Sequence, residues 1–99
     1  MELESCDYKR LASYFERYNG FKLSIAEGEE VGDSVKNVVE GIETVFDIVP
    51  ENVKQIIILS WIDPVSDDLL LNTLEIGKRK LNRVRVKVLN LLADEMVYV

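Results

Sequence analysis

A run of four aliphatic residues, Ile56–Leu59, lies near the middle of the chain and constrains its fold more than any other feature. Successive side chains of a β-strand point to opposite faces, so this run would make a strand that is apolar on both faces. Such strands lie in the centre of parallel sheets that helices cover on both sides. We therefore expect Lys54–Ile62 to form the central strand of an α/β domain.

The periodicity of the remaining sequence predicts helices and short strands on either side of that strand. Helical spacing of apolar residues predicts helices over residues 8–18, from Asp33 or Ser34 to residue 49, and from Ser66 or Asp67 to residue 81. Alternation of apolar and polar residues predicts strands over residues 21–25 and 83–91, and a last strand, Met96–Val99. The expected order is α-β-α-β-α-β-β in a single small domain of residues 1–99, with a mostly parallel central sheet and a C-terminal antiparallel hairpin.

Composition excludes several classes of enzyme. The chain has 99 residues, which fits one domain with its own core, and it contains no His and a single Cys, Cys6. Without His it has no Ser-His-Asp triad, no Cys-His nucleophile pair and no His-ligated metal. We therefore expect no cofactor and no metal, and we favour a protein that is not an enzyme. An acidic N-terminus without an apolar segment, together with the lone Cys, indicates a cytoplasmic protein without a membrane span.

Positive charge is concentrated in one short segment. Half of the 12 basic residues lie within residues 78–87, as Lys78, Arg79, Lys80, Arg83, Arg85 and Lys87. These six are candidate contacts to a phosphate backbone, because clustered cations on one face give affinity for nucleic acids. No aromatic residue is interleaved for base stacking, so we expect weak, sequence-independent binding at most. A solvated basic face that closes a helix and borders an edge strand is the alternative interpretation.

A second candidate site lies after the expected central strand. Asp63, Asp67 and Asp68 fall within six positions, where the end of that strand meets the start of a helix. Carboxylates in such a crevice could hold Mg²⁺, as in a metal-dependent phosphoesterase or nuclease. Capping of the helix and the Asp-Pro turn explain the same residues without any chemistry. We favour the structural interpretation and expect that Asp63 is not catalytic.

Three further residues have mainly structural interpretations, and the acidic residues leave a functional one open. Tyr14 and Trp61 are expected to be buried, with anchoring of a partner as the alternative. Gly41 lowers the intrinsic stability of its helix by about 1 kcal/mol, which predicts a close packing contact there. The acidic residues around Glu27–Glu30, and acidic charge elsewhere, leave open a protein that mimics DNA.

The chain as a whole is compact and rich in Val, Ile and Leu, with 30% charged residues, few Gly and Pro, and the runs 56–59 and 84–88. In these traits it resembles the small uncharacterised proteins of filamentous archaeal viruses, the lipothrixviruses and rudiviruses. The resemblance implies a virus-encoded, intracellular and heat-stable protein, and it assigns no functional residue. An ordinary cellular α/β domain is the alternative.

Our leading hypothesis from the sequence is a non-enzymatic interaction protein that acts through its surface on a macromolecule, a protein rather than a nucleic acid. We also expect a homodimer, because the apolar segment Met96–Val99 would form an unprotected edge strand that a second copy could pair with. The metal-dependent enzyme centred on Asp63, Asp67 and Asp68 and the nucleic-acid binder remain the two alternatives.

Overall fold

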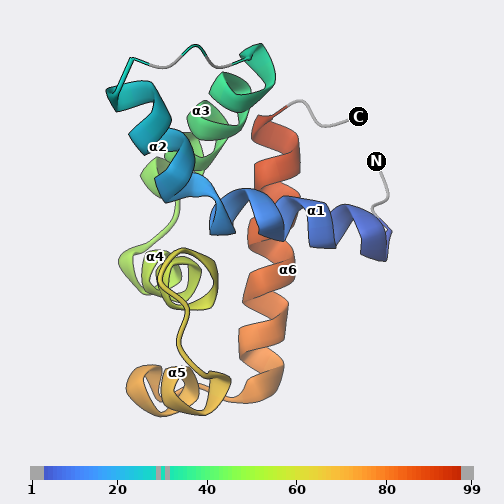
Figure 1. Cartoon of the computed structure of the whole chain (residues 1–99). Coiled ribbons are helices and arrows are strands. Elements are labelled where there is room, and N and C mark those ends of the chain that lie inside the picture. The colour runs from blue at the N-terminus through green and yellow to red at the C-terminus, as the bar shows by residue number, and fades with distance from the viewer. Residues whose placement is uncertain (1–3, 29, 31, 97–99) are drawn as a thin grey trace.

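The computed structural model describes residues 4–28, 30 and 32–96 of the chain. Within these residues the fold is entirely helical and contains no β-strand, so the predicted α/β class is wrong. The elements in chain order are α1 (Ser5–Glu16), α2 (Tyr18–Ala26), α3 (Asp33–Ile48), α4 (Glu51–Ile57), the π-helical turn η1 (Ile58–Ile62), α5 (Asp67–Leu74) and α6 (Lys78–Glu95). Figure 1 shows α6 as the long axis of the molecule, with α1 crossing it and the other helices along one side.

The predicted central strand is helical, in α4 and η1. Ile56, Ile57 and Trp61 are buried, whereas Ile58 is exposed, so the aliphatic run has one buried side and one exposed side. The Asp63 amide donates to the Ile58 carbonyl at 2.7 Å, a spacing of five residues that closes the π-helical turn. The composition of a run of four aliphatic residues is compatible with a strand or with a helix. In this fold the run is helical, and its buried side packs against the neighbouring helices.

The predicted strand over residues 83–91 is the middle of α6. Val84, Val86 and Val88 alternate over five residues, which is too short a window to distinguish a period of 2 from one of 3.6. The buried residues of the whole segment follow the helical period instead: Leu81, Val88, Leu89, Leu92 and Ala93. The predicted strand over residues 21–25 is likewise helical and lies within α2.

The third predicted helix ends earlier than expected. α5 ends at Leu74, because the next residue, Glu75, adopts the left-handed conformation with φ of 53°. Lys78–Lys80, which were expected to close this helix, instead open α6. Leu69, in the first half of α5, is 52% exposed.

The predicted C-terminal hairpin is also wrong within the described residues. Residues 92–95 continue α6, and Met96 caps that helix while its side chain is buried. The predicted dimerisation through an edge strand at Met96–Val99 is therefore unsupported, because Met96 is the C-cap of a helix and the described residues form no strand. Residues 97–99 lie outside the described part of the chain.

Two clusters of buried side chains hold the helices together. The large core cluster joins α1, α3, α4, η1 and the C-terminal half of α6, with Leu11, Phe15, Ile42, Ile57 and Leu92 among its members. Trp61 is buried in it and stacks on Phe15 with ring centroids 5.0 Å apart, which confirms its expected burial. Tyr14 packs against the cluster and is partly buried, at the boundary of the core. The small core cluster consists of Ile56, Leu70 and Leu81, one residue from each of α4, α5 and α6.

Gly41 lies where α3 meets the end of α6. A Cβ atom on this residue would come within 2.7 Å of Met96 Cγ and 3.3 Å of Leu92 Cδ1. The absence of a side chain therefore allows the two helices to approach, which confirms the close contact predicted from the glycine.

Candidate nucleic-acid interface

The sequence between Ser66 and Lys78 builds a tight connection between two helices. The Ser66 hydroxyl accepts a hydrogen bond from the Leu69 amide at 3.3 Å and so caps α5. Asp67 and Asp68 follow in the first turn, where the helix dipole favours negative charge. Three residues, 75–77, then reverse the chain, and Gly77 is the N-cap of α6.

The order of α5, a three-residue turn that contains Gly77, and α6 is the element order of a helix-turn-helix. Such motifs join two steeply crossing helices by a turn of three or four residues that often contains Gly, and the second helix enters the DNA groove. Figure 1 shows α5 beside the lower end of α6, at its left, and not running parallel to it. The small core cluster connects α4, α5 and α6, so the motif rests on a third helix.

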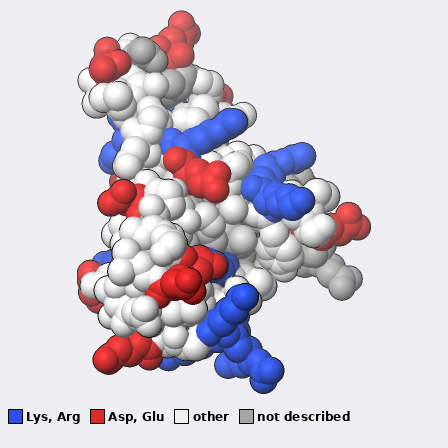
Figure 2. Space-filling model, turned by 60° about the horizontal axis from the view of Figure 1, so that its bottom comes forward, with Lys and Arg blue, Asp and Glu red and all other residues white. Residues whose placement is uncertain are grey.

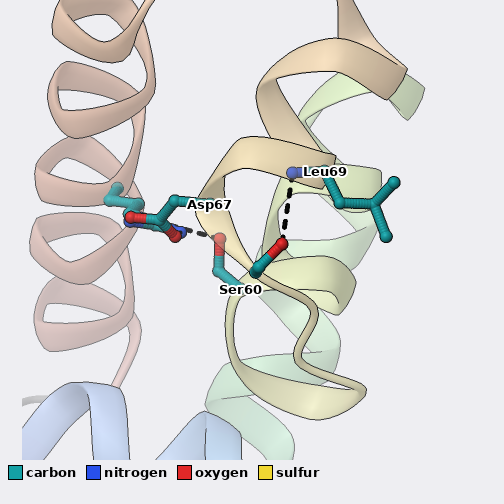
Figure 3. Close-up of polar contacts among 5 residues, drawn as sticks. Ser60, Asp67 and Leu69 are labelled. Atoms are coloured by element: carbon teal, nitrogen blue, oxygen red, sulfur yellow. Dashed lines mark hydrogen bonds and ion pairs between the residues drawn. The ribbon is translucent and has the colours of Figure 1, made fainter.

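An ion pair connects α5 to α6. Arg85 Nη2 lies 2.9 Å from Asp67 Oδ1, and its Nε donates to the Ser60 hydroxyl at 3.0 Å. Figure 3 shows Ser60 and Asp67 at the side of α6 that faces α5 and η1. The hydrogen bond from Arg85, followed by its positive charge, lowers the pKa of the Asp67 carboxyl. One guanidinium therefore connects η1, α5 and α6.

The three acidic candidates do not converge on a common point. Asp67 is paired with Arg85, Asp68 lies in the exposed first turn of α5, and Asp63 is exposed at the end of η1. In the part of the chain that the structure describes, no group of three His, Cys, Asp or Glu side chains is placed to hold a metal ion. Capping and the ion pair give Ser66 and Asp67 structural roles.

The basic candidates divide into an inner and an outer set. Arg85 points inward to Asp67, and Lys78 lies near enough to this carboxyl to contribute to the lowering of its pKa. Residues four apart lie on the same face of a helix, and successive residues are about 100° apart. Four exposed cations therefore share the outer face of α6, and we call them the basic stripe: Arg79, Lys80, Arg83 and Lys87.

No ion pair neutralises the basic stripe from within the described residues. The ion pairs found there join Lys22 to Glu43, Lys54 to Glu51 and Arg85 to Asp67. On the face shown in Figure 2, basic and acidic groups alternate over the surface, and no field of one sign covers it. The stripe is therefore a local feature of α6, spanning about 12 Å along the helix axis at 1.5 Å per residue.

The charges of α6 oppose its own dipole at both ends. Lys78, Arg79 and Lys80 occupy the first turn, and Asp94 and Glu95 occupy the last, the reverse of the favourable order. Each such charge costs about 0.3–1 kcal/mol at low ionic strength, and each like-charged pair four residues apart adds about 0.2–0.5 kcal/mol. The Arg79–Arg83 and Arg83–Lys87 pairs are of this kind. Helix stability therefore does not account for the basic stripe.

The sequence missed an apolar pocket on the same helix. It has a volume of about 320 Å³ and lies between the junction of α3 with α4 and the middle of α6. Its lining residues are Ile48, Val49, Pro50, Val53, Val84, Lys87, Val88 and Leu91. A helical interpretation of residues 84–91 would have placed Val84, Lys87, Val88 and Leu91 on one side and indicated this surface.

The remaining candidates show no converging chemistry. Cys6 is a free, exposed thiol, and the described residues of the acidic segment, Glu27, Gly28 and Glu30, are exposed. None of the described helices combines the length and apolarity that crossing a membrane requires.

Comparison with known proteins gives no match for this chain among protein-family models, curated proteins or solved structures. The resemblance to proteins of archaeal viruses stays a prediction.

Proposed function

We propose that this chain binds duplex DNA through the α5–α6 helix-turn-helix, with the N-terminal half of α6 in the major groove. The observation that carries the proposal is the basic stripe, four exposed cations on one helical face with no ion-pair partner among the described residues. Clustered cations of this kind gain affinity by releasing the counterions that surround DNA.

Shape and composition favour duplex DNA over single strands. An α-helix with its side chains is about 10–12 Å wide, and the major groove is about 12 Å wide. The first turns of the second helix contact base edges in helix-turn-helix proteins, while the preceding helix crosses the backbone. Asn82 is exposed among the cations, and no aromatic residue of α6 offers a platform for stacked bases.

The fold changes the order of the hypotheses that the sequence suggested. On a strand, residues 83, 85 and 87 would share a face and Arg79 would lie on another element. On α6, Arg85 turns inward and Arg79, Arg83 and Lys87 align. Nucleic-acid binding therefore replaces an interaction with a protein as the leading proposal.

The proposal is tested by fluorescence anisotropy with a labelled mixed-sequence duplex of ~20 base pairs at ~50 mM salt. The triple variant Arg79→Glu, Arg83→Glu, Lys87→Glu should bind about 100-fold more weakly than the unaltered chain, and the salt slope should fall by about 3.

A matched control changes the same net charge elsewhere. The triple variant Lys9→Glu, Arg10→Glu, Lys36→Glu reverses three exposed cations of α1 and α3. It should bind within a few-fold of the unaltered chain, because these cations lie on other helices and do not belong to the basic stripe. Equal losses in the two triple variants would show that net charge, not the stripe, governs binding. Absence of binding at ~50 mM salt and ~100 µM protein would contradict the proposal.

A further inference from the structure

The pocket on α6 has an apolar lining with one cation, Lys87, which suits a small apolar ligand with a negative group. Its volume of about 320 Å³ lies at the lower end of the range for small-molecule sites. One water occupies about 30 Å³, so the pocket has room for roughly ten methylene-sized groups. All of its lining residues are apolar except Lys87, and none of them is acidic.

The inner and outer lining residues of the pocket fit an amphiphile. Val88, only 1% exposed, is a lining residue and also a member of the large core cluster, so the pocket reaches the core. Ile48 is 54% exposed and Lys87 is exposed, so these residues form part of the rim. An aliphatic chain would bury its length against the valines while a negative head group meets the Lys87 ammonium.

A second copy of the chain fits this surface less well. In a symmetric dimer, one patch faces the same patch of the partner. Dimerisation over the pocket would bring Lys87 and the neighbouring cations of the basic stripe close to their own counterparts, and such like-charge juxtapositions are costly.

We propose that the pocket lined by Val49, Val53, Val84, Lys87 and Val88 binds an aliphatic monocarboxylate of medium chain length, with Lys87 as its counter-ion. The site is separate from the proposed DNA contacts except for Lys87, which belongs to both surfaces.

Isothermal titration with decanoate, decanol and decylammonium, in the absence of DNA, tests the proposal independently of the proposed function. Decanoate should bind with a dissociation constant between about 10 µM and 1 mM, more tightly than decanol, and decylammonium should bind least. Lys87→Met should weaken decanoate about fivefold and leave decanol unchanged or tighter, because only the charge pair is lost.

Two further variants separate the pocket from general adsorption. Val53→Phe should abolish binding of both decanoate and decanol, because the added ring occupies the pocket. Lys54→Met removes a neighbouring cation that does not line the pocket and should leave decanoate affinity within twofold. Circular dichroism verifies that each variant is folded. Equal weakening by the two lysine substitutions, equal affinity for the three ligands, or absence of decanoate binding at ~1 mM would overturn the proposal.

Discussion

The two halves of α6 are parts of one continuous helix with opposite surroundings. The N-terminal half, residues 78–87, contains six cations and contributes Leu81 to the small core cluster. The C-terminal half, residues 88–95, contains no cation and contributes Val88, Leu89, Leu92 and Ala93 to the large core cluster. The C-terminal half therefore makes most of the core contacts of α6, and the N-terminal half carries the exposed cations through which we propose that DNA binds.

The largest expected effect is a difference in unfolding free energy between a substitution in the C-terminal half of α6 and one in the N-terminal half. Leu92→Ala should lower the free energy of unfolding by about 2–5 kcal/mol, because Leu92 is fully buried and its truncation leaves a cavity. Lys80→Ala, in the exposed half, should not lower it and should change it by less than about 1 kcal/mol. Urea denaturation followed by circular dichroism measures both values. Similar losses of unfolding free energy in the two variants would contradict the view that the C-terminal half of α6 makes most of its core contacts.

A smaller effect tests how tightly the C-terminal half packs. Gly41→Ala should destabilise the protein by about 1–3 kcal/mol, although Ala is the better helix former, because the new Cβ would collide with Met96. Gly20→Ala is the matched control within α2, where a Cβ meets nothing within 4 Å, and it should stabilise by up to about 1 kcal/mol. Stabilisation by both substitutions in thermal melts would contradict the close approach.

The smallest effect concerns the ion pair that attaches α5 to the N-terminal half. Arg85 lowers the pKa of Asp67, so this carboxylate stabilises the fold above the ordinary Asp pKa of about 3.9, and the contribution is lost as pH falls through the lowered folded-state pKa. Because the Asp67 side chain is 56% exposed, the contribution at neutral pH should stay below about 1 kcal/mol.

Chemical denaturation of the Asp67→Asn variant, from pH 7 down to pH values below the ordinary Asp pKa of about 3.9, measures that contribution. The difference in unfolding free energy from the unaltered chain should be present at pH 7 and should disappear at the acidic end of the range. Asp68→Asn removes the adjacent carboxylate of the same helical turn and serves as the control for helix-dipole effects. A difference that persists unchanged into acid for Asp67→Asn would rule out the ion pair as its source.

Helices with strong apolar periodicity could be predicted from the sequence, whereas the remaining elements could not. The apolar stripes around Leu11 and Val38 predicted helices where α1 and α3 lie, and Ser66 correctly marked the start of α5. β-Branched residues misled the prediction in residues 54–62 and 83–91, because Ile and Val favour strands in general but adapt to helices when tertiary packing buries one side.

The candidate site depended on that same choice of secondary structure. The six cations could be identified from composition alone, since half of the positive charge lies in ten residues. Their division into the basic stripe and the inward Arg85 requires the helical period and the position of Asp67 on a neighbouring helix. The pocket depends on contacts between segments more than 30 residues apart, which no local pattern encodes.

Sharing α6 between both core clusters has a consequence for synthesis on the ribosome. Translation proceeds from the N-terminus at about 5–20 residues per second, so the 18 residues of α6 follow α5 by roughly 1–4 s. Before they emerge, Leu11, Phe15 and Ile42 lack the side chains of α6 that cover them, and Leu70 lacks Leu81. The nascent chain therefore exposes these apolar side chains until α6 is made.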